Sequence, residues 1–267
     1  MKLSKVFIYN NDRPESIEAA DKFRKSVEAD GIVVCHDCKD ADLLVCVGGD
    51  GAFLRFVQSC NFPSQPIIGI NTGHLGFFQE FTADRIGRFE EIIGTDRFTI
   101  QEIRPVCATV HHNLGVDQFL GLNEVLFRGP YSHLTHFTVS IEDTVIQEFS
   151  GDGMLVSTSA GSTAYNYSLG GALAAPELDA LQLTPIAPMN TNAYRCFRTS
   201  IVYPSSMKLT LTPNNRTSRD SIEVVNDGLT SSFRNVNKIE ITQSDVTINI
   251  IRLETYNYWE KLNSKLL

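Results

Sequence analysis

One short stretch of the sequence, Gly48-Gly49-Asp50-Gly51, has residues that could act on a phosphate group. It follows Leu43–Val47, an apolar run typical of a buried strand, and precedes Ala52–Val57, whose apolar spacing is typical of a helix. Glycine lets the backbone turn sharply and lets a ligand approach, and the unpaired N–H groups at a helix start attract anions. This strand-to-helix turn is therefore predicted to bind phosphate.

Asp50 needs a separate explanation, because a carboxylate is repelled by a phosphate beside it. Its charge becomes useful if it holds a hydroxyl group that attacks phosphorus, or if it faces a metal ion. The turn is therefore interpreted as a place where a hydroxyl group meets a phosphoryl group. The alternative is a tight turn with a solvated aspartate, which is common for an isolated Asp-Gly pair.

A polar pair further along the chain could bind a sugar. Asn123 and Glu124 interrupt the apolar run 119–127, and a buried pair of this kind is costly unless both side chains have partners. The two hydroxyl groups of a ribose would suit them. The alternative is a pair on an edge strand that faces water.

A third polar stretch begins at Gly151-Asp152-Gly153 and continues into residues 157–168, which are rich in hydroxyl-bearing and small side chains. These residues could form a neutral hydrogen-bonding pocket with Tyr165 as an aromatic wall. The alternative is a Ser/Thr/Gly loop that ends in a helix N-cap.

Several known signatures are absent from the sequence. There is no Gly-x4-Gly-Lys-Ser/Thr, so a P-loop is excluded, and there is no Gly-x-Ser-x-Gly or His-Glu-x-x-His. No Gly-x-Gly-x-x-Gly follows a strand in the N-terminal part, so the ordinary dinucleotide fingerprint is missing as well.

The elements that must position these residues change character near residue 98. Before it, strand-like and helix-like patterns alternate, which predicts a Rossmann-like α/β domain with a parallel sheet and helices on both faces. Ligands of such sheets bind at the carboxyl ends of the strands, where the turns 48–51 and 71–77 both lie. The predicted strands are 5–9, 32–35, 43–47 and 66–70, and the predicted helices are 15–29, 52–57 and 83–93.

After residue 98, short alternating runs separated by turn residues predict an antiparallel, β-sandwich-like domain. A possible helix at 161–173 interrupts it, and 256–267 reads as a final short helix. The predicted domains are 1–98, 99–253 and a tail at 254–267. The strand-like runs are 99–104, 106–111, 119–127, 137–141, 145–149, 200–211, 221–225, 238–241 and 246–253.

Composition limits the function. The 267 residues carry a net charge of −8, which argues against general nucleic-acid binding and against docking on anionic lipid. No apolar run is long enough to cross a membrane and no signal-peptide pattern is seen, so we expect a cytoplasmic protein with no nucleic-acid or membrane partner. The six cysteines are expected to be reduced thiols, because no second Cys or His pair completes a zinc site with Cys35 and Cys38.

In order and rough spacing, these turns resemble the NAD kinase family over nearly the whole chain. The resemblance rests on Gly48–Gly51, the turn 73–77, Leu122-Asn123-Glu124, Gly151–Gly153, and Gly161–Tyr165 with 168–171. It implies ATP-dependent transfer of a phosphoryl group to the 2′-hydroxyl of the adenosine ribose of NAD, with Mg²⁺ or another divalent cation. It also implies a C-terminal tail that packs back on the first domain, and a homo-oligomer, often a tetramer.

The resemblance also implies roles for individual residues. Asp50 would accept the proton of the 2′-hydroxyl, Gly48, Gly49 and Gly51 would lie against the ligands, and no side chain is assigned to the metal. Asn123 and Glu124 would contact the ribose and adenosine region, and Asp152 would face the nicotinamide end. Ser150 and Ala187 would lie beside the ligand. The residues implied for the adenine pocket are Thr163, Ala164, Tyr165 and Ser168, with the neighbouring Asn166 and Tyr167.

Two positions depart from the family pattern. Ala52 stands where relatives commonly have Thr, and Ser150 stands where some carry Arg, so one hydroxyl and one cation are missing. These departures keep open a non-enzymatic dinucleotide sensor as an alternative to an NAD kinase. The shared Gly-Gly-Asp-Gly turn keeps open a second alternative, a lipid or sphingoid kinase.

Overall fold

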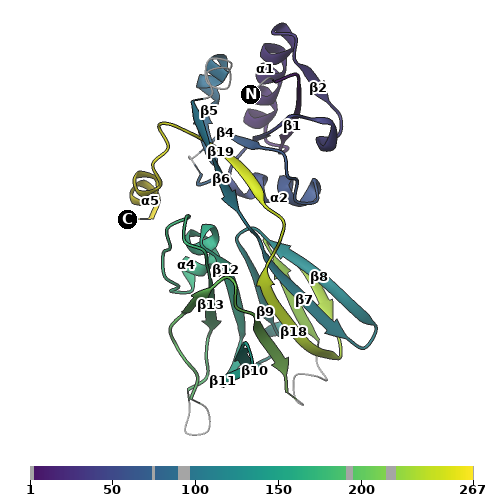
Figure 1. Ribbon diagram of the computed structural model, residues 1–267, viewed down its shortest axis with the longest axis vertical. Helices are drawn as coiled ribbons and strands as arrows, with labels where there is room; N and C mark the ends of the chain where they lie inside the picture. Colours follow the sequence, from purple (N-terminus) through teal and green to yellow (C-terminus); the bar gives the residue numbers. More distant parts are fainter. Residues whose placement is uncertain (1–2, 74–75, 90–96, 191–194, 215–220, 267) are drawn as a thin grey trace. The chain divides into compact units, whose positions relative to one another are not determined.

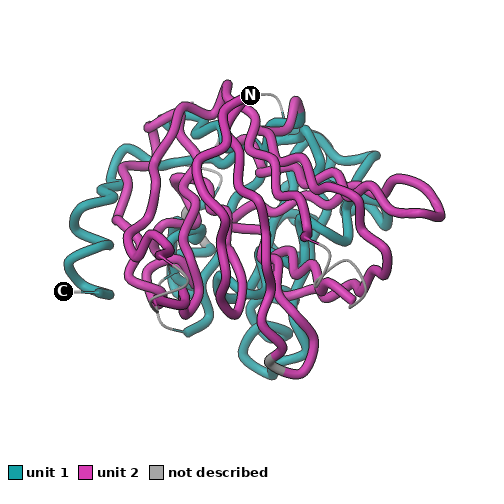
Figure 2. The backbone as a smooth tube through the Cα atoms, turned by 90° about the horizontal axis from the view of Figure 1, so that it is seen from below, with its two compact units in different colours: residues 1–103, 246–267 teal, residues 104–245 magenta. Residues whose placement is uncertain are grey.

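The computed structural model describes residues 3–73, 76–89, 97–190, 195–214 and 221–266 (Figure 1). The chain divides into two compact units, residues 1–103 together with 246–267, and residues 104–245 (Figure 2). The first unit is thus built from both ends of the sequence, and the second is inserted between them.

The first unit is organised around a seven-stranded, mostly parallel sheet in the order β2-β1-β3-β4-β19-β6, with β5 paired to β4. Its central strands β3 and β4 are largely apolar in sequence and are buried along their whole lengths. Only β6 runs antiparallel, against β19. The strands are β1 (Lys5–Asn10), β2 (Val33–Cys35), β3 (Leu43–Val47), β4 (Ile67–Asn71), β5 (Gln79–Thr82), β6 (Phe98–Ile103) and β19 (Ile248–Leu253).

Helices of this unit pack apolar residues against the sheet. Helix α1 (Pro14–Ala29) buries Ala20, Phe23 and Val27 as its spacing predicts, whereas Ile17, expected on the same face, is 44% exposed. The other helices among the described residues of this unit are α2 (Asp50–Ser59), α5 (Tyr258–Leu266) and the 3-10 turns η1 (Cys38–Asp40) and η2 (Ala83–Arg88). The turn η2 covers the start of the helix predicted at 83–93, and residues 90–93 lie outside the described residues.

The second unit is a sandwich of two six-stranded antiparallel sheets, as the alternating pattern predicts. One sheet has the order β11-β10-β15-β18-β7-β8 and the other β14-β13-β12-β9-β16-β17, and side chains from both form one core. The strands of the first are β7 (Val106–His112), β8 (Gly115–Gly121), β10 (Thr135–Ile141), β11 (Thr144–Gly151), β15 (Leu209–Pro213) and β18 (Val236–Gln243). Those of the second are β9 (Glu124–Arg128), β12 (Gly153–Thr158), β13 (Ala180–Ile186), β14 (Ile201–Pro204), β16 (Ile222–Asn226) and β17 (Leu229–Phe233).

Several elements differ from the sequence-based expectation. Strands β6 and β19 belong to the parallel sheet of the first unit, where Ile250 of β19 is buried opposite Ile67 of β4, and not to the sandwich. The run 119–127 is split into β8 and β9, and the helix expected at 161–173 is reduced to the short turns η4 (Ala160–Thr163) and α4 (Tyr165–Ser168). Strands β5, β12, β13 and β17 were not predicted.

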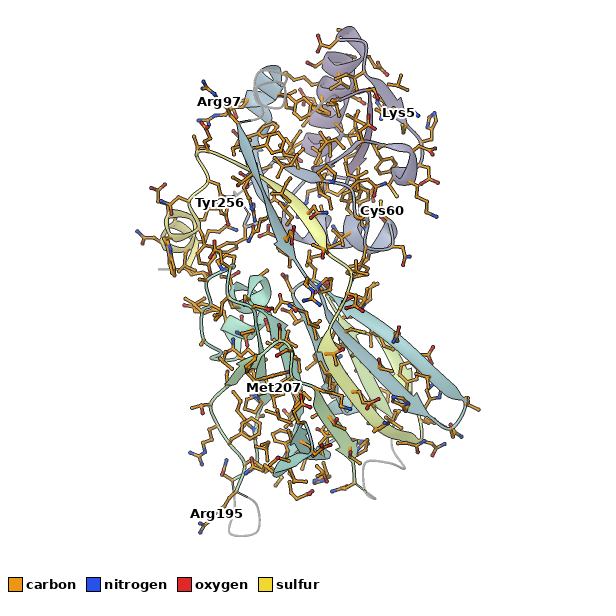
Figure 3. The ribbon with its side chains drawn as sticks, in the orientation of Figure 1. Lys5, Cys60, Arg97, Arg195, Met207 and Tyr256 are labelled. Carbon is orange, nitrogen blue, oxygen red and sulfur yellow. The ribbon has the colours of Figure 1, made fainter. Side chains whose placement is uncertain are left out.

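The six cysteines are all free thiols, among them Cys60 at the end of α2 (Figure 3). Within the described ranges, no helix combines the length and the apolar character that a membrane span requires.

Candidate functional site

The Gly-Gly-Asp-Gly turn connects the carboxyl end of β3 to the first residue of α2, as predicted. Gly48 has a φ of +149°, and a side chain there would place its Cβ 2.7 Å from the Cβ of Ala52. Its N–H group donates to the carbonyl oxygen of Ile70 on β4, over 2.8 Å. Both the backbone conformation and the space therefore require glycine at this position.

Asp50, the first residue of α2, is held by the turn that follows β4. The N–H of Phe77 donates to its Oδ2 over 3.0 Å, and the N–H of Phe78 donates to its Oδ1 over 3.1 Å. A Cβ on Gly76 would lie 2.1 Å from Oδ1, so glycine is needed for this close approach. The two predicted glycine turns thus meet at the Asp50 carboxylate. His74 and Leu75 of the second turn lie outside the described residues.

Lys265 of helix α5 adds a positive charge beside Asp50. Its Nζ is 3.6 Å from Oδ2 of Asp50 and 5.0 Å from the centre of the Phe77 ring. Asp50 also sits at the N-terminus of α2, where the helix dipole favours negative charge. The carboxylate is therefore fixed in position and surrounded by donors and positive charge.

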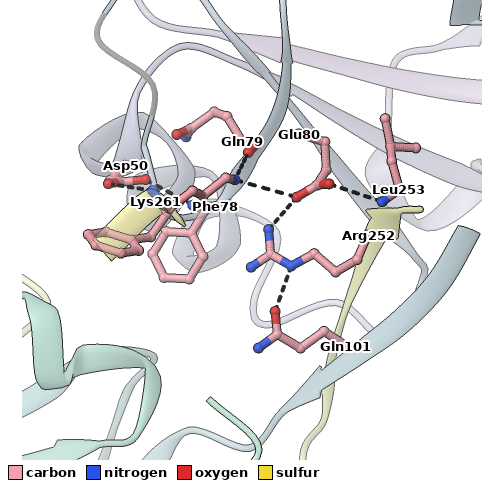
Figure 4. Close-up of polar contacts among 9 residues, drawn as sticks. Asp50, Phe78, Gln79, Glu80, Gln101, Arg252, Leu253 and Lys261 are labelled. Carbon is pink, nitrogen blue, oxygen red and sulfur yellow. Dashed lines mark hydrogen bonds and ion pairs between the residues drawn. The ribbon is translucent and has the colours of Figure 1, made fainter. Parts of the chain in front are cut away.

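A buried ion cluster next to this turn attaches the C-terminal residues to the sheet (Figure 4). Glu80 of β5, whose side chain is 1% exposed, pairs with Arg252 over 2.5 Å and with Lys261 over 3.7 Å. Lys261 also donates to the carbonyl oxygen of Gln79, and burial lowers the pKa of its ammonium to about 8. Arg252 stacks over the ring of Tyr256, which is labelled in Figure 3, with its guanidinium carbon 4.1 Å from the ring centre.

In the second unit, Asp227 shapes the turn that presents Asn123 and Glu124. Its carboxylate accepts the N–H groups of Leu122, Asn123 and Glu124 over 2.6, 2.9 and 3.1 Å. The hydroxyl of Thr158 donates to the carbonyl oxygen of Leu122 over 2.7 Å, which joins the turn to the end of β12. Asp227 lies in a loop late in the chain, and its anchoring role was not predicted.

On this turn Asn123 is buried and Glu124 is half-buried, and both side chains are incompletely paired. Within the described part of the chain, Oδ1 of Asn123 and Oε2 of Glu124 have no hydrogen-bond partner. Burial, together with the charge of Asp227, raises the pKa of Glu124 to about 8, and burial raises the pKa of Asp227 to about 6. Buried polar atoms without partners are costly, so the turn is suited to a polar ligand.

A separate cavity of about 450 Å³ in the same unit is lined by two of the predicted residues, Asp152 and Tyr165. It also contains Arg128 of β9, which pairs with Glu223 of β16 over 2.8 Å. Arg128 was not predicted. Its position opposite Gly153 in the sheet register becomes apparent only once β9 and β12 are paired.

The remaining predicted residues lie around β11, β13 and the short turns η4 and α4. Ser150 is buried, and its hydroxyl pairs with Nδ1 of His136 over 2.7 Å, while Ala187 follows β13 with a φ of +43°. Thr163 ends η4, Ala164 precedes α4, and Tyr167 and Ser168 are exposed on α4. The amide of Asn166 is fully buried and accepts from the hydroxyl of Thr184 over 2.6 Å, so it serves the internal structure of this region.

The predicted residues therefore form three clusters, one in the first unit around Asp50 and two in the second, around Glu124 and around Asp152. The lysines of α5 and the Glu80–Arg252 pair were missed. The sequence does hold one signal for these lysines: Lys261 and Lys265 are four residues apart on a predicted helix and therefore lie on the same face of it. In the described residues no group of three or more His, Cys, Asp or Glu side chains is arranged to hold a metal ion.

Comparison with known proteins adds independent information. Residues 6–96 match the family model described as the ATP-NAD kinase N-terminal domain, and residues 122–253 match that of the ATP-NAD kinase C-terminal domain. A protein named NAD kinase from Finegoldia magna is 36% identical over 266 residues, covering 98% of this chain and 97% of its own. A protein named NAD kinase 2 from Bacillus subtilis is 31% identical over 267 residues, covering 98% and 97%.

Two solved structures share the fold. The structure of yeast NADH kinase complexed with NADH has a TM-score of 0.86 and 19% identity, covering 99% of this chain and 87% of that one. An NAD kinase from Archaeoglobus fulgidus in complex with ATP has a TM-score of 0.78 and 22% identity, covering 97% and 99%. Two family models that together span most of the chain, and relatives above 30% identity over nearly all of it, show that this protein belongs to the ATP-NAD kinase family.

Proposed function

We propose that this chain transfers the γ-phosphoryl group of ATP to the 2′-hydroxyl of the adenosine ribose of NAD, giving NADP and ADP. The family to which it belongs catalyses ATP-dependent phosphorylation of NAD. The observation that carries the proposal is the Asp50 carboxylate, which two backbone N–H groups and Lys265 hold at a glycine-rich strand-to-helix turn.

In this proposal Asp50 holds the 2′-hydroxyl for attack. The 2′-oxygen forms a bond to the γ-phosphorus, the bond from that phosphorus to the bridging oxygen of ADP breaks, and Asp50 accepts the hydroxyl proton. An aspartate is a weak base near neutral pH, so orientation of the hydroxyl is the larger part of its role. Phosphoryl transfer depends mainly on in-line positioning and charge stabilisation, which a fixed carboxylate and backbone N–H groups provide.

A divalent cation, Mg²⁺ in our proposal, accompanies ATP. Mg²⁺ in kinases is commonly bound by one or two carboxylates together with substrate phosphates, which fits a chain whose described residues offer a carboxylate at the turn and no protein cage. The cation would neutralise charge on the triphosphate.

The second unit would bind the dinucleotide. Asn123 and Glu124 would contact the ribose and adenosine region, because their unpaired buried atoms need polar partners. Thr163, Ala164, Tyr165, Tyr167 and Ser168 would line the adenine pocket. Asp152 would face the nicotinamide end, with Ser150 and Ala187 beside the ligand, whereas the amide of Asn166 would support the pocket from within.

We further propose that the protein works in the cytoplasm as a homo-oligomer, a tetramer by family analogy. Apolar side chains on edge strands favour association, among them Val116 of β8 at 57% exposed and Val202 of β14 at 51% exposed. Light scattering of the purified chain would measure the assembly, and a monomer at micromolar concentration would contradict this part of the proposal.

The test of the reaction is a coupled assay in which ATP, Mg²⁺ and NAD are supplied and NADP is detected by a strictly NADP-dependent dehydrogenase. We expect NADP to form with the wild-type chain and Asp50→Asn to lose turnover by orders of magnitude while NAD binding remains. A wild-type chain that binds NAD but makes no NADP would instead support the non-enzymatic sensor. Phosphorylation of a sphingoid base in place of NAD would support the lipid-kinase alternative.

A further inference from the structure

We propose that Lys265 of helix α5 is a phosphate-binding residue of the phosphoryl-transfer site, where it contacts an oxygen of the γ-phosphate of ATP. The inference rests on the proposed function. It assigns a chemical role to a helix that follows all the recognised turns of the sequence.

The position of the ammonium group supports this role. At 3.6 Å from Oδ2 of Asp50, Nζ of Lys265 is within ion-pair range of the carboxylate and beyond ordinary hydrogen-bonding distance. The Lys265 side chain is 26% exposed and that of Asp50 is 30% exposed, so both groups are accessible to an incoming ligand. A lysine ammonium has three N–H donors, which leaves donors for a phosphate oxygen.

Buried contacts of helix α5 fix the position of the Lys265 ammonium group. Tyr258, Lys261 and Leu262 are buried, and Lys261 donates to the carbonyl oxygen of Gln79. Gln79 directly follows Phe78, whose N–H group holds Asp50. The helix is therefore fastened to the segment that holds the carboxylate, and Lys265 lies one helical turn beyond the fastening point.

The charge balance of the site also calls for a cation here. A triphosphate would bring several negative charges next to Asp50, in a chain whose net charge is already −8. Arg55 of α2 is a second cation near the turn, with its Nη1 3.8 Å from the place where a Cβ on Gly51 would lie. Cations that meet the transferring phosphoryl group stabilise the charge that spreads over its oxygens in the transition state.

In the complex, Lys265 bridges Oδ2 of Asp50 and a γ-phosphate oxygen. It thereby lowers the repulsion between the carboxylate and the triphosphate, so that the 2′-hydroxyl and the phosphorus can approach. Loss of this charge should weaken the interaction with ATP far more than the interaction with NAD.

The experiment compares Lys265→Met, which keeps the length and removes the charge, with Lys265→Arg and with the control Lys25→Met at an exposed lysine of α1. We expect kcat/KM for ATP to fall roughly 10- to 100-fold in Lys265→Met, less than for a fully buried donor. The KM for NAD should stay within about twofold, Lys265→Arg should recover most of the loss, and Lys25→Met should resemble the wild type. Binding of inorganic tripolyphosphate, measured by calorimetry without NAD, should weaken in parallel.

Because Met could loosen the end of α5, thermal unfolding is recorded for each variant and Lys265→Gln is a second neutral substitution. Comparable rises in KM for ATP and for NAD, with a lower unfolding midpoint and unchanged binding of tripolyphosphate, would overturn the proposal in favour of a structural contact. Unchanged ATP kinetics in both neutral variants would also overturn it. An inactive wild-type enzyme contradicts the proposed function itself, whereas an active wild type with an indifferent Lys265 contradicts only this inference.

Discussion

Glu124 and Asp227 form a half-buried acidic pair in which the two residues have different tasks. Asp227 accepts three backbone N–H groups, which stabilise its charged form, whereas Oε2 of Glu124 has no partner among the described residues. With a pKa of about 8, Glu124 is mostly protonated at neutral pH. It can therefore donate an O–H group to a ligand oxygen, which an ionised carboxylate cannot do.

This pair makes stability depend on pH. The pKa of Glu124 rises from 4.5 in the unfolded chain to about 8, so the folded state holds a proton that the unfolded state releases. The stabilisation is complete below pH 4.5 and is lost as the pH rises through 8. Between those values the free energy of unfolding should fall by up to about 1.4 kcal/mol per pH unit for this proton.

Urea unfolding followed by circular dichroism between pH 5 and pH 8.5 measures this slope. Glu124→Gln, which is neutral at every pH, should flatten the slope above about pH 6, whereas the raised pKa of Asp227 still contributes a fall below it. Glu177→Gln at an exposed position should leave the slope unchanged. The same slope in Glu124→Gln and in the wild type would show that another group dominates.

At the scale of elements, Arg252 connects three strands of the first unit. From β19 it pairs with Glu80 of β5 and donates to Oε1 of Gln101 on β6 over 2.6 Å. The side chains of Arg252 and Glu80 are 5% and 1% exposed, so solvent cannot replace either partner. A buried ion pair of this kind fixes the register of the strands. When one partner is removed, the other is left as an uncompensated buried charge.

Arg252→Met should therefore destabilise the protein by on the order of 3 kcal/mol, measured by chemical denaturation. The double variant Glu80→Gln, Arg252→Met should recover part of the loss, because the Glu80 charge is then no longer buried without Arg252, while Lys261 keeps the carbonyl oxygen of Gln79 as its partner but loses its carboxylate. Lys238→Met, which removes an exposed partner of Glu240, is the control and should cost less than about 1 kcal/mol. A loss in Arg252→Met as small as in this control would contradict the role given to the pair.

At the scale of the whole molecule, the two units have different requirements for folding. The core of the second unit comes entirely from residues between Val106 and Ile241. The core of the first unit includes Ile251 of β19, which lies beyond the second unit in sequence. Ile103 and Ile248 are opposite each other in the β6–β19 pair, so the second unit leaves and rejoins the first sheet at one place.

Three fragments test this difference. Residues 104–245 should fold alone into a β protein with cooperative unfolding, and residues 1–103 should not, because β4 and β6 then have no β19 between them. Joining 1–103 to 246–267 through a short Gly/Ser linker from Ile103 to the residues before Ile248 should restore cooperative unfolding. Circular dichroism and urea titration compare the three, and a stable 1–103 fragment would show that β19 is dispensable.

An element of the fold could be predicted from the sequence where the pattern that specifies it is local. The strand Leu43–Val47, the turn after it and helix α1 were predicted because apolar periodicity and glycine spacing are local features. Strand β13 was missed because Pro185 interrupts its pattern, and β17 because its Thr230, Ser231 and Ser232 are polar. The assignment of β19 to the wrong unit has another cause, since its sequence predicts a strand but not which sheet it joins.

The same distinction applies to the candidate site. Asp50, Asn123 and Glu124 were found from short motifs, whereas Asp227 and Lys265 act on residues more than 100 positions away in the sequence. No local pattern records such a contact. These contacts depend on how the strands pair and on where α5 packs.

The central place of β19 in the first sheet has a consequence for biosynthesis. A ribosome makes every residue of the second unit before it makes the strand that lies between β4 and β6. The usual order, in which the N-terminal part of a nascent chain matures first, is thus reversed, and the sandwich can be complete while the sheet of the first unit is still open. The Asp50 turn gains Lys265 only when synthesis reaches α5, so the charges around this carboxylate are completed by residues made after the whole second unit.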